Sequence, residues 1–124
     1  EDYQKSLYVV QENLRVQQAV KALKNNDILM LGKLLYESHN GLQYQYKVSC
    51  EELDFLVNKA KENLNVIGAR MMGGGFGGCT INIISKKATP NFVKEVSKLY
   101  HEKFNNECSV YFVEISEGTH LLKQ

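Results

Sequence analysis

Five of the chain's nine glycines fall within one six-residue run, Gly73-Gly74-Gly75-Phe76-Gly77-Gly78. Glycine has no Cβ, so a segment rich in it reaches positive φ at little cost and lets its backbone approach a ligand closely. Loops of this kind typically hold a phosphate, or pack beside the loop that does. A hairpin turn needs only one or two glycines. The run therefore favours a functional loop over an ordinary turn.

The residues around the loop exclude three familiar nucleotide-binding motifs. Gly73, Gly75 and Gly78 fit the spacing G-x-G-x-x-G, but that motif needs a helix directly after the loop. Residues 79–84 instead alternate and are rich in β-branched side chains, which predicts a strand. The chain lacks the H-R-D and D-F-G tripeptides of protein kinases. Cys79 also stands where a Walker A loop requires lysine.

Composition narrows the class of protein. With 124 residues, of which 44% are hydrophobic, residues 1–124 are expected to form one domain with its own core. The net charge is +1 without a basic stripe, so we expect neither a nucleic-acid partner nor a membrane partner. Cys50, Cys79 and Cys108 are too widely spaced for a disulfide framework or a metal site, as is typical of the cytoplasm. No apolar run reaches membrane-spanning length and no signal peptide is seen.

Hydrophobic spacing predicts an alternation of helices and strands. Helices are expected over residues 3–23, 27–39, 49–63 and 89–104, and strands over residues 66–72, 79–85 and 108–115. Asp27 is expected to cap the second helix and Gly41 to end it. Ser49 and Glu52 have the spacing of a capping box, and Pro90 suits a first helical position.

This order predicts the later part of a β-α-β-β-α-β unit. The fold class is then α+β, with a ferredoxin-like antiparallel sheet and helices on one face. The first strand of such a unit is missing from residues 1–124, and the chain begins with Glu1 inside a helical pattern. We therefore expect a fragment of a longer protein. A missing central strand leaves unpaired backbone groups, so the piece should contact its upstream half or associate with itself.

Four segments, in order, resemble the galactokinase family within the GHMP small-molecule kinases. Residues 70–79, Arg-Met-Met-Gly-Gly-Gly-Phe-Gly-Gly-Cys, resemble the third signature motif of that superfamily. Residues 8–16 are similar to the family's V-x-x-E-N-x-R-V helix, and residues 38–54 to its S-H-x-S-L…Y-x-V-S-x-x-E-L-D segment. Residues 116–118 resemble the start of its S-x-G-A motif. The chain departs from the family pattern at three positions, Gly41, Met72 and Thr119, where Ser, Thr and Ala are usual.

The resemblance implies a kinase that phosphorylates galactose at its anomeric hydroxyl, with ATP, to give galactose 1-phosphate. The family's sugar-binding motif, phosphate loop and catalytic Asp belong to an N-terminal domain, and none of these motifs occurs in this sequence. No catalytic residue and no metal ligand is therefore assigned here. Mg²⁺ would enter with ATP and bind outside this chain. The expected partners are MgATP, galactose and the N-terminal domain, and the isolated piece is expected to be inactive.

By the same resemblance, the glycine loop lies beside ATP and the sugar. Gly73, Gly74, Gly75, Gly77 and Gly78 are expected to bring backbone N–H dipoles close to the phosphates, with Phe76 anchoring the loop by packing. Arg70 is a candidate for a phosphate contact or for an ion pair with a carboxylate at the domain interface. The ion pair is favoured because structural pairs are common. His39 is interpreted as a cap or an interface hydrogen-bonding group, and not as a base.

Two alternatives stay open. The parent protein is a sibling GHMP kinase for another sugar, or a galactokinase-like sensor that binds sugar and nucleotide without catalysis. The residues of the sugar pocket would distinguish a sibling kinase from a galactokinase. The presence of the catalytic Asp and the phosphate loop would distinguish a kinase from a sensor. All three lie outside residues 1–124.

Overall fold

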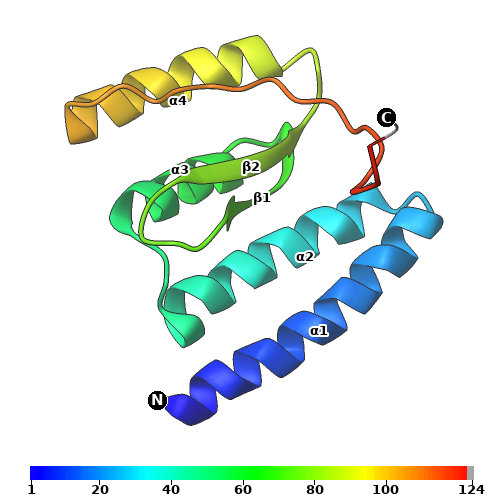
Figure 1. Cartoon of the computed structure of the whole chain (residues 1–124). Coiled ribbons are helices and arrows are strands. Elements are labelled where there is room, and N and C mark those ends of the chain that lie inside the picture. Colours follow the sequence, from blue (N-terminus) through cyan, green and yellow to red (C-terminus); the bar gives the residue numbers. More distant parts are fainter. Residues whose placement is uncertain (123–124) are drawn as a thin grey trace.

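The computed structural model describes residues 1–122, which form helices around a small sheet. The elements in order are α1 (Asp2–Lys24), α2 (Ile28–Gly41), the π-helical segment η1 (Leu42–Tyr46), α3 (Glu51–Glu62), β1 (Val66–Met72), β2 (Cys79–Ile84) and α4 (Thr89–Phe104). The two strands lie between α2 on one side and α4 on the other, and α1 is outermost beside α2 (Figure 1). The predicted α+β class is confirmed.

The sheet consists of β1 and β2, paired antiparallel. Val66 lies opposite Ile84 and Met72 opposite Cys79, with a register shift between Val66 and Gly68. The glycine run joins the two strands at the Met72–Cys79 end. Both strands lie where the sequence predicted them, β1 over the expected residues 66–72 and β2 one residue short of the expected 79–85.

The predicted strand at residues 108–115 is wrong for the described part of the chain. Residues 107–115 have no strand pairing and return from α4 as a coil (Figure 1). Their β-branched and aromatic composition favours a strand only when a neighbouring strand supplies hydrogen bonds. Tyr111 and Phe112 are both 75% exposed. Composition alone therefore does not form a strand here.

Two buried clusters share β1. The first joins α3 and α4 to the sheet and comprises Val57, Ala60, Val66, Ala69, Phe92 and Val96. The second joins α1, η1 and α3 to the end of β1 and comprises Tyr8, Leu42, Leu53 and Met71. Burying a large aliphatic or aromatic side chain contributes about 1.5–3 kcal/mol. The second cluster lies directly under the strand end that enters the glycine loop.

The ends of α2 show where local signals hold and where they fail. Asp27 caps the helix, because its Oδ1 accepts a hydrogen bond from the Met30 N–H at 3.1 Å. α2 ends at Gly41 as predicted, but not through a left-handed cap, since Gly41 has a helical φ of −65° and the chain continues into η1. A Cβ on Gly41 would lie 2.5 Å from the Tyr8 ring. Glycine is therefore needed at residue 41 for space, and the turn comes later, at Lys47 with φ +61°.

The predicted capping box at the start of α3 does not form. The N-cap residue is Cys50, which makes no side-chain cap hydrogen bond. The Ser49 hydroxyl donates instead to Asp54 Oδ1 at 2.6 Å. At α4 the prediction holds, because Pro90 lies in the first turn. Within residues 1–122, no helix combines the length and the apolar character that a bilayer crossing needs.

Candidate functional site

The glycine loop, residues 73–78, adopts a backbone that other residues rarely reach. Gly73, Gly75, Gly77 and Gly78 have φ of +85°, +90°, +149° and +101°. Phe76 also has positive φ, at +59°. Only Gly74 in the loop lies outside this region. Four of the five loop glycines therefore use the positive φ that glycine reaches at little cost.

One side of the loop is anchored through its backbone. The Phe76 N–H donates to the carbonyl oxygen of Val48 at 2.7 Å. A Cβ on Gly75 would lie only 2.2 Å from the same oxygen. The Val48 N–H in turn donates to the Leu42 carbonyl at 3.0 Å. The loop thus rests on the short connection between η1 and α3.

The other side of the loop is open. A Cβ on Gly73, Gly74 or Gly77 would meet no atom within 4 Å. The prediction that Phe76 anchors the loop by packing is wrong for the described residues, because its side chain is 75% exposed. The loop is held through the Phe76 backbone N–H, and the Phe76 side chain is largely exposed.

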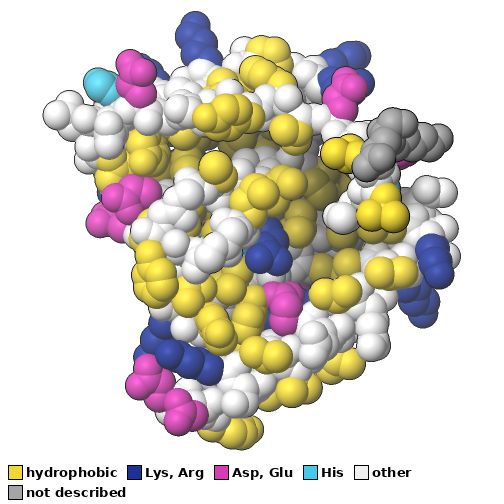
Figure 2. Space-filling model, viewed as in Figure 1, with side chains coloured by type: hydrophobic (Ala, Val, Ile, Leu, Met, Phe, Trp, Pro, Cys, Tyr) yellow, Lys and Arg dark blue, Asp and Glu magenta, His cyan; other side chains and the backbone are white. Residues whose placement is uncertain are grey.

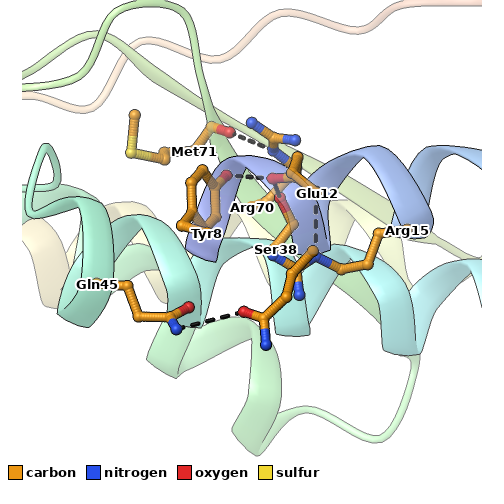
Figure 3. A network of polar contacts seen from close by, with 8 residues as sticks. Tyr8, Glu12, Arg15, Ser38, Gln45, Arg70 and Met71 are labelled. Atoms are coloured by element: carbon orange, nitrogen blue, oxygen red, sulfur yellow. Dashed lines mark hydrogen bonds and ion pairs between the residues drawn. The ribbon is translucent and has the colours of Figure 1, made fainter. Parts of the chain in front are cut away.

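Arg70 lies in β1, close to the loop. Its Nε donates to the carbonyl oxygen of the next residue, Met71, at 2.7 Å (Figure 3). None of the ion pairs within residues 1–122 includes Arg70, so the favoured pair with a carboxylate is not made by this part of the chain. The bond to the Met71 carbonyl fixes the side chain at the end of β1.

His39 is one of the least exposed side chains, at 1%. Its Nδ1 accepts a hydrogen bond from the Met71 N–H at 3.1 Å, and its Nε2 lies 2.9 Å from Asp54 Oδ1. The imidazole is therefore neutral with its proton on Nε2, which donates to Asp54. Burial lowers the pKa of His39, and the hydrogen bond to Asp54 opposes that shift only in part. The sequence predicted a cap or an interface hydrogen-bonding group at His39, and the structure shows a buried side chain whose two partners, Met71 and Asp54, lie within this chain.

Asp54 connects three segments of the chain through hydrogen bonds to its carboxylate. It lies in the first turn of α3 with Glu51 and Glu52, where the helix dipole favours negative charge. The structure shows its Oδ1 accepting from both His39 and Ser49. Asp54 therefore links α2, α3 and the segment before α3. The only signal in the sequence was the family motif that contains Ser49 and Asp54.

A second polar network joins α1 to α2. Glu12 accepts hydrogen bonds from Ser38 Oγ at 2.6 Å, from Arg15 Nε at 3.1 Å and from the Tyr8 hydroxyl (Figure 3). Burial raises the pKa of Tyr8 to about 12, and the Glu12 carboxylate adds to the shift. Burial alone would raise the pKa of Glu12, but the hydrogen bonds from Ser38, Tyr8 and Arg15 lower it. Glu12 is a partly buried carboxylate that accepts hydrogen bonds from three donors.

One hollow among the described residues lies away from the glycine loop. It has a volume of about 580 Å³ and lies among α1, α2, η1 and α3, where Arg15, Tyr36 and Lys61 line it. No loop glycine contributes to it. Across residues 1–122, no group of three His, Cys, Asp or Glu side chains is arranged to hold a metal ion.

Comparison with known proteins identifies the family. Residues 19–102 match the sequence profile described as GHMP kinases C terminal. The galactokinase of Clostridium beijerinckii is 47% identical over 112 residues, which are 90% of this chain and 29% of that protein. The galactokinase of Thermosipho africanus is 41% identical over 116 residues, which are 94% of this chain and 33% of that protein. The chain thus spans about a third of these relatives.

A solved structure agrees with the sequence relatives. The crystal structure of Lactococcus lactis galactokinase complexed with galactose superposes with a TM-score of 0.80 at 38% identity, covering 84% of this chain and 27% of that one. The profile match alone spans more than half of the chain. This chain belongs to the family of GHMP kinase C-terminal domains.

Proposed function

We propose that this chain is the C-terminal part of a galactokinase, which transfers a phosphoryl group from ATP to the anomeric hydroxyl of galactose. The observation that carries the proposal is the glycine loop, which is anchored at Val48 on one side and open on the other. The names of the relatives supply the substrate, since both sequence relatives and the solved structure are galactokinases.

The loop's chemistry fits a phosphate. Gly73, Gly74 and Gly77 have free space where a side chain would be, so their N–H groups can approach an anion closely. Fixed backbone dipoles of this kind stabilise charge that develops during phosphoryl transfer. Arg70 is a further candidate for a phosphate contact, or for an ion pair with a carboxylate of the N-terminal domain. ATP supplies the phosphoryl group, and the residues that hold Mg²⁺ belong to the N-terminal domain in this proposal.

The exposed apolar surface supports a partner domain. Six side chains along α1 are about half exposed, namely Val9, Val10, Leu14, Val16, Val20 and Leu23. Hydrophobic side chains also spread across the middle of the face in Figure 2. Surfaces of this extent usually mark an interface. We infer that the N-terminal two-thirds of a galactokinase covers part of this surface and that the isolated chain is inactive.

The free state of all three cysteines, Cys50, Cys79 and Cys108, suits a cytoplasmic enzyme.

The proposed kinase function is tested by ADP release from the complete protein with MgATP and, in turn, galactose, N-acetylgalactosamine, arabinose and glucose. Turnover with galactose and not with glucose would support the proposal. Turnover with another sugar alone would assign a sibling kinase, and saturable sugar binding without turnover would assign a sensor.

A further inference from the structure

We propose that His39 and Asp54 are positioning residues that hold the glycine loop in place. They do so by fixing the two segments that support the loop, which are the end of β1 and the connection before α3. The effect of this pair on turnover rests on the proposed kinase function, whereas its effect on the loop does not. Neither residue is within the loop, and neither is offered as an acid or a base. The proposal depends on how the two side chains connect β1 to the segment that receives the loop.

The first support is the strand that enters the loop. Met71 is two residues before Gly73, and its N–H donates to His39 Nδ1 at 3.1 Å. The Met71 side chain is fully buried, with 0% exposure, so the strand cannot shift here without opening the core. His39 therefore fixes the position of the end of β1, from which the chain enters the loop at Gly73.

The second support is the connection before α3. Val48 accepts the Phe76 N–H, and the neighbouring Ser49 donates its hydroxyl to Asp54 Oδ1 at 2.6 Å. The same carboxylate oxygen accepts from His39 Nε2 at 2.9 Å. Asp54 Oδ1 is thus bonded to Ser49, which neighbours the loop contact Val48, and to His39, which holds the end of β1.

Neutral histidine suits this role because its two nitrogens face opposite ways, one accepting and one donating. Asparagine reproduces an acceptor near Nδ1 and loses the link to Asp54. Glutamine reproduces a donor near Nε2 and loses the link to Met71. The two variants therefore separate the two arms of the pair.

The test measures hydrogen exchange of the Phe76 amide in the complete protein, by mass spectrometry of peptides that cover residues 73–80. The Phe76 N–H does not touch His39 and reports only on the contact with Val48. We expect His39→Asn, and Ser49→Ala to a lesser degree, to speed this exchange about fivefold to tenfold, as expected for loss of one hydrogen bond. Val96→Ala, in the other core cluster on α4, is the control for general destabilisation.

Kinetics supply the second readout. We expect His39→Asn and His39→Gln to lower kcat about tenfold while the KM for the sugar stays within about twofold, because a displaced loop weakens transition-state contacts and spares sugar binding. Val96→Ala should leave kcat unchanged at temperatures below its unfolding transition. Should His39→Asn fail to fold, Phe76 exchange and kcat are measured on Ser49→Ala and Asp54→Asn instead, since each leaves His39 in place.

The outcomes separate the two proposals. If Phe76 exchange in the His39 and Ser49 variants equals that of Val96→Ala, the pair only stabilises the fold and the inference is overturned. If exchange rises and kcat does not change, positioning for turnover is overturned. If the unmodified complete protein turns over no sugar, the kinase proposal fails, and the exchange measurement still decides whether the pair holds the loop.

Discussion

Gly32 of α2 and Gly68 of β1 touch through their backbones. A Cβ on Gly68 would lie 2.4 Å from Gly32 Cα, and a Cβ on Gly32 would lie 2.2 Å from the carbonyl oxygen of Ile67. The helix therefore lies directly on the strand, without side chains between them. Glycine inside a strand commonly marks such a close approach. This contact sets the distance between α2, which carries His39, and β1, which carries Met71.

Gly32→Ala and Gly68→Ala should each lower the free energy of unfolding by about 3 kcal/mol, because the added methyl group would overlap backbone atoms that cannot rotate away. Urea unfolding measures the change. Gly118→Ala is the matched control, since a Cβ there meets no atom within 4 Å. Equal stability of Gly68→Ala and Gly118→Ala would mean that α2 moves off β1 easily.

Gly75→Ala and Gly74→Ala should differ although they are neighbours. At Gly75 the new methyl group meets the Val48 carbonyl at 2.2 Å and the backbone has φ +90°. A side chain in such a conformation costs about 1–3 kcal/mol, so the loop should leave Val48 and Phe76 amide exchange should rise. Gly74→Ala should leave both stability and exchange unchanged.

Gly74→Val in the complete protein should cut turnover without changing stability. A Cβ at Gly74 would meet no atom of the described residues within 4 Å, so we expect the clash to come from the substrate or from the N-terminal domain. Steady-state kinetics and urea unfolding of the same variant measure the two effects. Unchanged kinetics would show that the loop has only a structural role.

Glu12→Ala should destabilise the protein by about 2–4 kcal/mol, because three donors, on Tyr8, Arg15 and Ser38, would lose their acceptor. The control is Glu37→Ala, since the 3.8 Å pair of Glu37 with Lys33 is exposed and worth at most about 1 kcal/mol. Urea unfolding compares the two variants. Similar losses for both would mean that water replaces Glu12 readily.

Stability should fall as the pH drops below about 6.5. Burial lowers the pKa of His39 in the folded protein from its ordinary value of 6.5. The unfolded state then binds more protons than the folded state, so the contribution of His39 is complete above about pH 6.5 and is lost as the pH falls toward the folded pKa. Urea unfolding at about pH 7.5, 6.5 and 5.5 measures how the free energy of unfolding changes with pH.

His39→Gln should flatten that slope, while His101→Gln should retain it, because His101 is exposed on α4. Glu12, whose pKa lies below its ordinary 4.5, contributes a separate loss at more acidic pH, below about 4.5. A slope that persists in His39→Gln over the same pH range would assign the effect to another group.

The helices and the two strands could be predicted because their signals are local. Apolar spacing marked α1, α2, α3 and α4, and the alternation of residues 79–84 marked β2. The cap at Asp27 and the proline in the first turn of α4 depend on neighbouring residues alone, and both predictions hold. The glycine loop could be predicted for the same reason, since positive φ is a property of single residues.

The failed predictions depend on contacts that no local pattern marks. Gly41 ends α2 with a helical φ, and the Tyr8 ring leaves no room for a side chain there. Ser49 leaves its helix cap for Asp54, and Phe76 holds the loop with its N–H while its ring stays exposed. None of these contacts leaves a periodic pattern in the chain.

Short-range spacing and motif order were enough to establish the order of the elements, the conformational freedom of the loop and the GHMP kinase family. What holds the loop in place became clear only from the packed chain: the Val48 carbonyl, the His39–Asp54 pair and the contact of Gly32 with Gly68. Each of these contacts joins residues that are far apart along the chain. Such residues meet only when the helices pack on the sheet, because no local signal brings them together.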